Sequence, residues 1–361
     1  MRVLWFNWRD IKNSEAGGAE VLTHEIAARL VQKRNYQITL FTAQFRGGLS
    51  SENIDGVNII REGGRYTVYN KAKSYYNKNK NNFDLVIDEI NVRPFLTPKF
   101  VNEEKPLVAL IHQISPEQFL LELPFPMSYI GHYYEKKWLS HYKNIPTITV
   151  SNSTKNDLEK LGFKKIFIIP EGLSTTPLPT VPDKEPVPTI VFIGRLKKHK
   201  LPHHAILAFS TIKKQIPNAR LWVIGDGYMR KELQKSKIKD VTFYGRVDSL
   251  MKYKLLSKAH LAVVPAIREG WGLVVVECNS MGTPVVAYDV PGLRDSVKNG
   301  ETGVLIKDKS PASLAISVIC ILKDNHLLSR LSSNALSFSR QFSWDTSSDV
   351  FHKIINNIAI T

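Results

Sequence analysis

The sequence predicts an α/β protein built from two Rossmann-like, doubly wound domains that face each other across a cleft. Short apolar runs of β type alternate with segments of helical period along the chain, a pattern typical of parallel sheets joined by crossover helices. One proline-rich stretch interrupts this alternation, and the pattern then starts again. At 361 residues the chain is long enough for two domains, each with its own core.

The composition is typical of a globular protein, with 43% hydrophobic and 23% charged residues. A formal net charge of +16 favours phosphorylated ligands, nucleic acid or anionic lipid, and a basic solubilising surface explains it equally well. No apolar run approaches the roughly 20 residues that span a bilayer, and no signal peptide is visible, so we expect a cytoplasmic protein. Cys278 and Cys320 lie in apolar, helix-like contexts, which predicts reduced, buried thiols.

The first domain is expected over residues 1–173. It opens with a strand at Arg2–Trp8, and a helix then runs from Gly17 to about Arg34, with apolar residues at helical spacing. Short β-rich runs predict further strands at Gln37–Thr42, Val57–Arg61, Phe83–Asp88, Pro106–Ile111, Pro146–Ser151 and Ile166–Ile169.

Residues 174–188 contain five prolines and no hydrophobic periodicity, which predicts a semi-rigid linker. The second domain is expected over residues 189–340. Its predicted strands are Thr189–Ile193, Ala219–Ile224, Val241–Tyr244, Leu261–Pro265 and Pro284–Tyr288, with helices at Pro202–Ile216 and Gly272–Met281. Residues 341–361 contain a final helix-like stretch that is a candidate to cross back onto the first domain.

The stretch E-G-W-G-L-V-V-V-E, from Glu269 to Glu277, follows a predicted buried strand. Its first residues therefore fall at the carboxyl end of that strand, where open α/β sheets bind ligands. A helix that starts near Gly272 presents unpaired N–H groups to an anion, and Glu277 can accept hydrogen bonds from hydroxyls. These features predict a site for a nucleotide sugar. The alternative is a capped surface helix with two solvated glutamates.

Other turns of the second domain carry related signals. Arg195 follows the first strand and Lys200 lies close behind, so both are candidates to neutralise a pyrophosphate. Gly225, and Arg246 with Val247, follow the next two strands, where the backbone can approach a flat ring closely. A basic surface turn and ordinary loops between strand and helix explain the same residues.

The first domain offers Gly17 and Gly18 at a helix start, where free N–H groups suit a phosphate. His112 follows a strand, so its titratable side chain lies at a carboxyl edge; a structural loop histidine is the alternative. The sequence has no D-x-D, P-loop, G-x-S-x-G or H-E-x-x-H motif, which predicts no metal site. The glycine pair also lacks the G-x-G-x-x-G spacing of nicotinamide sites.

Residues 126–143 combine tyrosines and Trp138 at helical spacing with Lys136 and Lys137. A helix of this kind fits the interface of an anionic membrane, and an aromatic stripe in the core is the other reading. The basic, tyrosine-rich residues 65–80 are a second candidate for such contact, or a solvated loop. The expected localisation is therefore cytoplasmic, with these segments as candidates for peripheral contact with the cytosolic membrane face.

In combination and in order, these residues resemble the retaining glycosyltransferases of family 4, which have the GT-B fold of two Rossmann-like domains. The resemblance covers nearly the whole chain. It rests on G-G-A-E at 17–20, His112 after its strand, V-S-N-S at 150–153, I-P-E-G at 169–172, F-I-G-R at 192–195 with Lys200, V-I-G-D-G at 223–227, and the pair Glu269 and Glu277.

Three positions depart from the family pattern. Trp271 stands where the family commonly has phenylalanine, and Glu171 occupies a position often held by asparagine. The segment Leu196–Lys200 lacks the usual small residue after the lysine, which leaves open which lysine contacts the phosphate.

The resemblance implies that Arg195 and Lys200 bind the donor diphosphate, that Glu277 binds the ribose, and that Glu269 binds the transferred sugar. His112 would lie beside that sugar, so the candidate catalytic residues are His112, Glu269, Arg195 and Lys200. The remaining candidate donor contacts are Gly17, Gly18, Gly225, Arg246, Val247, Gly270, Trp271, Gly272 and Leu273.

No side chain fits the role of a covalent nucleophile, so we expect front-face transfer with retention of configuration, in which the leaving phosphate helps to take the acceptor's proton. Positioning and electrostatic stabilisation would supply most of the catalysis. The expected co-substrate is a UDP- or GDP-sugar, without metal or other cofactor, and the expected acceptor is a hydroxyl of a glycan or lipid-linked sugar.

A sugar-nucleotide isomerase or epimerase on the same two-domain plan is the alternative function. A basic nucleic-acid-binding protein is a third class, but no such module is visible and no nucleic-acid partner is expected.

Overall fold

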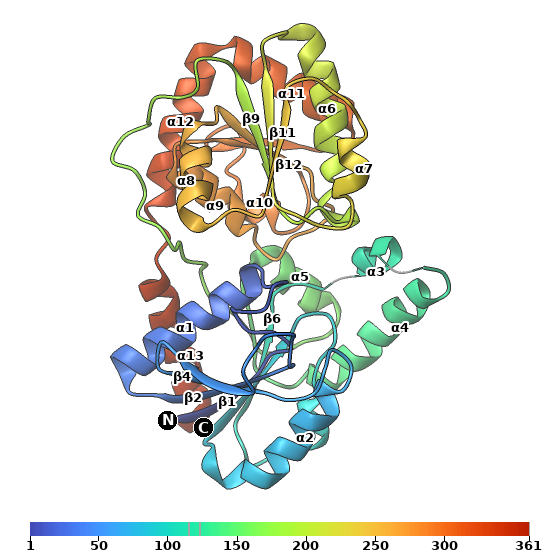
Figure 1. Ribbon diagram of the computed structural model, residues 1–361. Helices are drawn as coiled ribbons and strands as arrows, with labels where there is room; N and C mark the ends of the chain where they lie inside the picture. Colours follow the sequence, from blue (N-terminus) through green and yellow to red (C-terminus); the bar gives the residue numbers. More distant parts are fainter. Residues whose placement is uncertain (115, 123, 361) are drawn as a thin grey trace. The chain divides into compact units, whose positions relative to one another are not determined.

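The computed structural model describes residues 1–114, 116–122 and 124–360. The chain forms two compact units, each with its own sheet and helices (Figure 1). The first unit comprises Met1–Pro116, Phe125–Gly172 and the chain from Ser343 onward; the second comprises Glu117–Pro124 and Leu173–Phe342. Both are Rossmann-like α/β units, as the sequence predicts.

The first unit contains a sheet of eight strands within the described residues, in the order β3-β4-β2-β1-β5-β6-β7-β8. All neighbours are parallel except β3 and β4, which are antiparallel. The strands are β1 Arg2–Phe6, β2 Gln37–Thr42, β3 Ser51–Ile54, β4 Val57–Arg61, β5 Leu85–Ile90, β6 Leu107–Ile111, β7 Thr147–Thr149 and β8 Ile166–Ile168.

Alternating side chains of β1 bury themselves on the two faces of this sheet. Leu4 and Phe6 pack with the buried residues of α2, whereas Trp5 stacks on Phe351 of α13 at a centroid distance of 5.2 Å. Helix α13 also packs against α1 (Figure 1). The helices of this unit are α1 Gly18–Arg34, α2 Val68–Asn79, α4 Met127–Leu139, α5 Asn152–Lys160 and α13 Trp344–Ile360, with short 3₁₀ turns at Lys80–Asn82, Thr97–Lys99 and Ser140–Tyr142.

The second unit contains a parallel sheet of six strands within the described residues, in the order β11-β10-β9-β12-β13-β14. The strands are β9 Thr189–Ile193, β10 Arg220–Ile224, β11 Val241–Gly245, β12 Leu261–Val264, β13 Val285–Tyr288 and β14 Gly303–Ile306. Near-continuous apolar burial along the central strands β9, β12 and β13 reflects a sheet covered on both faces.

Helices α8, α9 and α12 lie on one face of this sheet and α6 and α11 on the other (Figure 1). The helices are α6 Pro202–Gln215, α7 Arg230–Gln234, α8 Ser249–Lys258, α9 Leu273–Ser280, α10 Leu293–Ser296, α11 Pro311–Lys323 and α12 Asn325–Ser339. Helix α3, Pro116–Glu122, also belongs to this unit apart from its first residue, and a 3₁₀ turn spans Lys198–Lys200.

Several sequence-based boundaries differ from the structure. Residues 117–124, expected in the first domain, belong to the second unit because the carboxylates of α3 bind its loops. Residues 174–188 pack along the second unit, where the partly buried Lys184 Nζ donates hydrogen bonds to Ser257 O, Met281 O and Thr283 Oγ1. The C-terminal helix lies in the first unit, and Thr361 falls outside the described residues.

Other local expectations are wrong. Residues 65–80 are largely helix α2, which buries Val68, Ala72 and Tyr76, four residues apart, and therefore not a solvated loop. Cys278 is buried as expected, but Cys320 is exposed. Among the described residues, no single helix is both long and apolar enough to cross a bilayer; α11 and α12 meet that criterion only as a pair bent by 99°.

Candidate functional site

Two oppositely charged side chains of the second unit meet beside the carboxyl ends of β9 and β12, which are neighbours in the sheet. The amine of Lys200, in the 3₁₀ turn after β9, donates a hydrogen bond to Glu269 Oε1, in the loop after β12. The backbone joins the same two loops, because Ile267 N donates to His199 O at 3.1 Å. The side chains of Lys200 and Glu269 remain 19% and 14% exposed, so a ligand can reach both.

Arg195 adds a second cation at the end of β9. Its guanidinium is half-buried and has no hydrogen-bond or ion-pair partner among the residues that the structure describes. Burial lowers the pKa of His199, and the neighbouring charges of Lys200 and Arg195 act in the same direction. Both cations thus act on His199, and an anion bound by Arg195 and Lys200 would gain charge-assisted hydrogen bonds.

Helix α9 begins at this edge of the sheet. Its N-cap, Gly272, has φ +99°, a left-handed conformation that favours glycine, and it offers no side-chain cap. The N–H groups of Leu273 and Val274 precede the first bonded N–H of the helix, that of Val275, which donates to Gly272 O at 2.8 Å, and they suit an anion. The indole N–H of Trp271 is buried without a hydrogen-bond partner in the described part of the chain.

Glu277 lies in the second turn of α9 and accepts a hydrogen bond of 2.7 Å from Lys252 Nζ on α8. Arg246 is exposed after β11, and Val247 is half-buried against the core of this unit. Gly225 has a packing role, since a Cβ atom there would lie 2.0 Å from the carbonyl oxygen of Gly194. The close backbone approach at Gly225 is thus made to the neighbouring turn of the protein.

The first unit holds Gly17 and Gly18 at the start of α1. The extended Gly17 donates its N–H to Glu20 Oε2 at 2.6 Å, while Glu20 Oε1 accepts a hydrogen bond of 2.9 Å from Arg9 Nε. Arg9 and Glu20 are both buried. Arg9 was not among the predicted site residues, although its position after the carboxyl end of β1 could have indicated it.

His112 follows β6 and is buried in a hydrogen-bond network centred on Glu89. Its Nε2 lies 3.0 Å from Glu89 Oε1. The same carboxylate accepts hydrogen bonds from Trp5 Nε1 at 2.9 Å and Thr23 Oγ1 at 2.5 Å. Glu89 lies near the end of β5 and is a second residue that the sequence analysis missed, because a carboxylate inside an apolar strand carries no motif.

The electrostatics of this network depend on burial. Burial opposes the charged imidazole, but the hydrogen bond from His112 to Glu89 and the nearby carboxylates outweigh it and raise the pKa of His112. Burial raises the pKa of Glu171 to about 8, and the His112 charge opposes that shift. Glu171 Oε2 is buried without a hydrogen-bond partner in the described chain.

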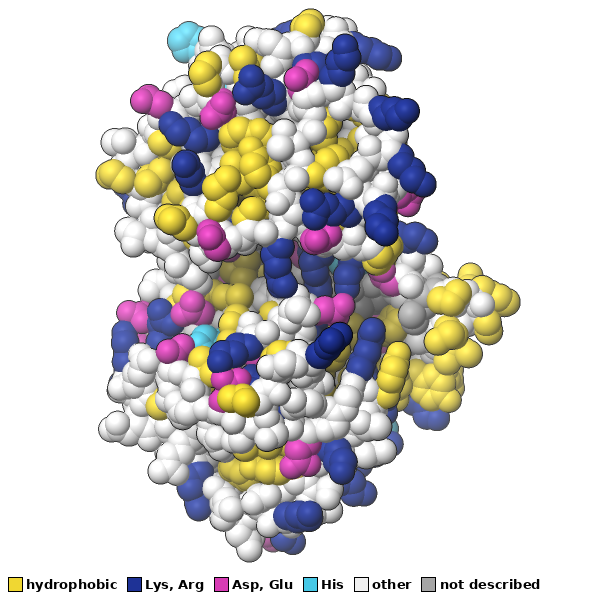
Figure 2. Space-filling view, viewed as in Figure 1, with side chains coloured by type: hydrophobic (Ala, Val, Ile, Leu, Met, Phe, Trp, Pro, Cys, Tyr) yellow, Lys and Arg dark blue, Asp and Glu magenta, His cyan; other side chains and the backbone are white. Residues whose placement is uncertain are grey.

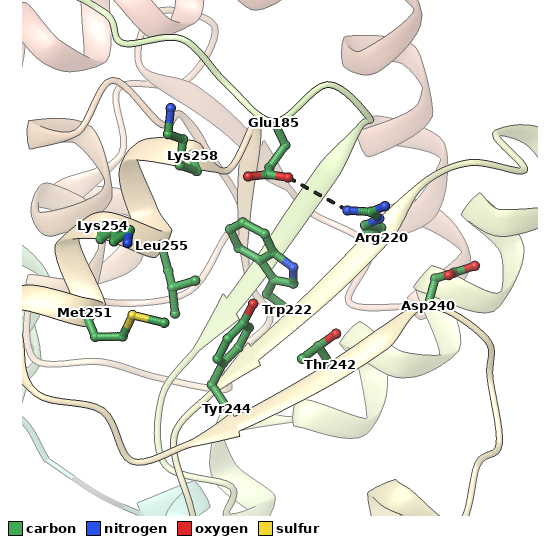
Figure 3. A pocket seen from close by; sticks show the side chains of 10 residues that line it. All are labelled: Glu185, Arg220, Trp222, Asp240, Thr242, Tyr244, Met251, Lys254, Leu255 and Lys258. Atoms are coloured by element: carbon green, nitrogen blue, oxygen red, sulfur yellow. Dashed lines mark ion pairs between the residues drawn. The ribbon is translucent and has the colours of Figure 1, made fainter.

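A separate cavity of about 460 Å³ lies on the second unit between β10, β11 and α8 (Figure 3). Trp222 and Tyr244 form one side of it, and Glu185 pairs with Arg220 at its rim at 3.8 Å. None of the residues predicted for the donor site lines this cavity. The predicted site residues instead group at the carboxyl ends of the strands, separately in each unit.

Comparisons with known proteins agree with this arrangement. The family model for glycosyl transferases group 1 matches residues 179–338, and that for glycosyltransferase family 4 matches residues 16–176. Glycogen synthase of Mycobacterium tuberculosis is 30% identical over 211 residues, covering 55% of this chain and 51% of its own length. Phosphatidyl-myo-inositol mannosyltransferase of Mycobacterium leprae is 26% identical over 230 residues, covering 61% of each chain. The matched region thus spans about half to three fifths of the length of these curated relatives.

Solved structures match over almost the whole chain. Sucrose-phosphate synthase of Thermosynechococcus elongatus has a TM-score of 0.79 at 19% identity, covering 99% of this chain and 98% of its own. Anabaena HepE in complex with UDP-glucose has a TM-score of 0.75 at 16% identity, covering 99% of this chain and 100% of its own. The fold is therefore that of the GT-B glycosyltransferases. The two family matches place the chain more narrowly: it belongs to the family 4 type of this class.

Proposed function

We propose that the protein transfers a hexose from a nucleotide-diphosphate sugar to an acceptor hydroxyl, with retention of configuration. The observation that carries this proposal is the Lys200–Glu269 pair, which lies with the uncommitted Arg195 guanidinium at the carboxyl edge of the second sheet. A diphosphate can replace Glu269 as the partner of Lys200. The released carboxylate can then accept hydrogen bonds from the hydroxyls of the transferred sugar.

The proposed donor is a UDP- or GDP-sugar, bound as a co-substrate without metal or other cofactor. The complex of HepE with UDP-glucose supports a uridine nucleotide. Arg195 and Lys200 would hold the diphosphate with the first N–H groups of α9, and Glu277 would accept from the ribose hydroxyls. We assign the base to the end of β11, near Arg246 and Val247, and the transferred sugar to Glu269 and His112.

Retention without a covalent nucleophile requires that the acceptor attack on the face from which the diphosphate leaves. The leaving phosphate oxygen then takes the acceptor's proton, while Arg195 and Lys200 stabilise the charge that develops on the phosphate. The alternative of a sugar-nucleotide isomerase is not favoured, because both family matches describe glycosyltransferases.

Two variants test the donor site. We expect Glu269→Gln and Lys200→Met to lower transfer roughly 100-fold or more, the loss typical of removing a charge-stabilising group. Glu301→Gln, on an exposed carboxylate away from the site, is the matched control. A thermal-shift screen of UDP-, GDP- and ADP-sugars identifies the donor, and NMR of the first-formed product gives its anomeric configuration. Unchanged transfer in both variants, or an inverted product, would contradict the proposal.

We further propose that the acceptor is a lipid-linked sugar and that α4 contacts the membrane carrying it. Helix α4 exposes Met127, Tyr129, Ile130, Tyr133 and Tyr134, whose exposed fractions range from 41% to 64%. Figure 2 shows hydrophobic side chains gathered where this helix lies. The lysines of its last turn are also exposed, which suits anionic headgroups.

Not all the aromatic residues predicted at this helix are exposed in the structure. Tyr142 lies in the 3₁₀ turn after α4 and is fully buried, with its hydroxyl 2.5 Å from Asp88 Oδ2. Trp138 is half-buried beside Tyr134, at a centroid distance of 5.7 Å. The surface proposed to contact a membrane is therefore formed by the first three turns of α4. Lys136 and Lys137, in the last turn of the helix, lie at the end of this surface.

Liposome co-sedimentation tests this surface. Tyr129→Ser with Ile130→Ser should reduce binding to anionic vesicles several-fold, and Lys136→Gln with Lys137→Gln should reduce it mainly at low salt. Ile316→Ser, which removes an apolar side chain that is 60% exposed on α11, is the matched control. Equal binding of all variants would remove the basis for membrane contact and leave a soluble glycan as the acceptor.

A further inference from the structure

Helix α3 belongs to the second unit apart from its first residue, although its neighbours in the chain belong to the first. The segment leaves the first unit after β6 and returns to it before α4, yet Glu117–Pro124 clusters with the second unit. It carries two carboxylates, Glu117 and Glu122, and each binds a loop of the candidate donor site. Both loops lie far downstream of α3 in the sequence, so these contacts are long-range.

Glu122 binds the loop after β9. Its Oε1 accepts hydrogen bonds from the backbone N–H of His199 at 3.0 Å and from Nδ1 of the same residue at 2.6 Å. Its Oε2 accepts from the Tyr228 hydroxyl at 2.7 Å, and that hydroxyl accepts from Lys198 N at 2.8 Å. Burial opposes ionisation of Glu122, but these hydrogen bonds outweigh it and lower the pKa of its carboxyl.

Glu117 binds the loop after β12 through Arg268. The guanidinium donates from Nε at 3.1 Å and from Nη2 at 3.2 Å to the two oxygens of the carboxylate. This forked geometry fixes both distance and orientation. Arg268 is 7% exposed, so its position is also set by the protein around it.

The two contacts share one sequence relation to the site. His199 directly precedes Lys200, and Arg268 directly precedes Glu269. Each carboxylate of α3 therefore holds the residue before one member of the Lys200–Glu269 pair. The hydrogen bond from Ile267 N to His199 O closes the arrangement by joining the two loops.

We propose that Glu117 and Glu122 are positioning residues, which hold the loops after β9 and β12 so that Lys200 and Glu269 meet the donor in a fixed geometry. This inference rests on the proposed function for its effect on the donor, but the ordering of the loops can be measured without any ligand. In this proposal α3 orders the two loops and contacts neither the diphosphate nor the sugar.

The test uses the full-length Glu117→Gln/Glu122→Gln variant, with Glu301→Gln as the control for loss of an exposed carboxylate. Hydrogen–deuterium exchange of the ligand-free protein should be at least fivefold faster in peptides covering residues 196–201 and 266–271, and unchanged in the core strands. Unchanged exchange in both loops would contradict the proposal that α3 orders them, whatever ligand the protein binds.

The donor supplies a second readout. With UDP as the probe, the double variant should bind about tenfold more weakly and show a raised donor KM, while kcat changes less than threefold. The effect of Glu122→Gln on UDP affinity should be smaller in a His199→Ala background, because the contact with the imidazole is already lost there, whereas the backbone N–H of residue 199 and the Tyr228 hydroxyl still donate to Glu122. Tighter binding of UDP by the double variant would contradict positioning and show that α3 competes with the anion. If the wild-type protein binds no nucleotide, the proposed function fails, and the exchange measurement still decides the role of α3.

Discussion

The charged pairs among the candidate site residues differ in exposure between the two units. In the first unit, His112 and Glu89 have side chains that are 10% and 0% exposed, and the protein itself supplies their partners. In the second unit, Lys200, Glu269, Lys252 and Glu277 are paired with one another, and their side chains are 14–22% exposed. Burial and hydrogen bonds fix the orientation of the His112–Glu89 pair, whereas partial exposure lets a ligand replace a partner in the pairs of the second unit. The buried pair of the first unit therefore stays bound to partners within the protein, whereas the pairs of the second unit are accessible to a ligand.

The largest expected effect separates binding from chemistry. Arg195→Ala or Lys200→Ala should weaken UDP binding roughly 10- to 100-fold, since each removes a charge-assisted hydrogen bond worth about 1.5–3 kcal/mol. His112→Ala should leave UDP affinity within about threefold and reduce the rate of transfer. Isothermal titration of UDP, combined with initial rates, checks both. If His112→Ala weakened UDP binding as much as Lys200→Ala, the division of roles between the units would be wrong.

Glu89→Gln tests the buried network. It removes the charge that raises the pKa of His112, so burial should then lower that pKa. A raised pKa of His112 means that protonation of the imidazole stabilises the folded state. This contribution is complete below the pKa that histidine has in the unfolded chain, and it is lost as the pH rises through the pKa of His112 in the folded state. The loss of stability in Glu89→Gln should therefore be larger at pH 6 than at pH 9. We expect a loss of about 2–4 kcal/mol at pH 6, typical of breaking a buried pair. Urea denaturation at both pH values and NMR titration of the imidazole measure the two effects, and a pH-independent loss would contradict the coupling.

Glu171→Gln should stabilise the protein selectively at high pH. The folded pKa of Glu171 is about 8, above its ordinary value, so the folded state holds a proton that the unfolded state has released. Stability should therefore fall between about pH 5 and pH 8 in the wild-type protein, and the amide should remove up to about 4 kcal/mol of that fall. Denaturation midpoints across pH 5–9 check this. Parallel curves for the two proteins would show that Glu171 is ionised in the fold.

The smallest effect is expected at the exposed pairs. Lys252→Met breaks the contact with Glu277, but both side chains are about one fifth exposed, so the stability change should be under about 1 kcal/mol. UDP affinity should change by less than about threefold, since Glu277 keeps its carboxylate. A loss above about 2 kcal/mol in urea denaturation would mean that this pair behaves like the buried network of the first unit.

Most strands were predictable from short clusters of apolar residues. The strands at Gln37–Thr42, Val57–Arg61 and Thr189–Ile193 match the predicted ranges in full, because each is a short segment rich in β-branched and apolar residues. Strand β3 was not predicted, since Ser51–Ile54 is a polar, partly exposed edge strand without such a run. The short strand Gly303–Ile306 was also missed, although its apolar residues could have indicated it.

The sequence by itself determined the two α/β units, the position of the candidate residues after strand ends, and the family. It could do so because chain-local patterns of apolar residues and glycines dictate strands, turns and helix starts. Only the tertiary structure decided which of these side chains are partners. It paired Lys200 with Glu269 and His112 with Glu89, and it moved α3 from the unit of its sequence neighbours to the other. Such contacts join residues far apart in the chain, and their energies depend on burial, which a local pattern does not encode.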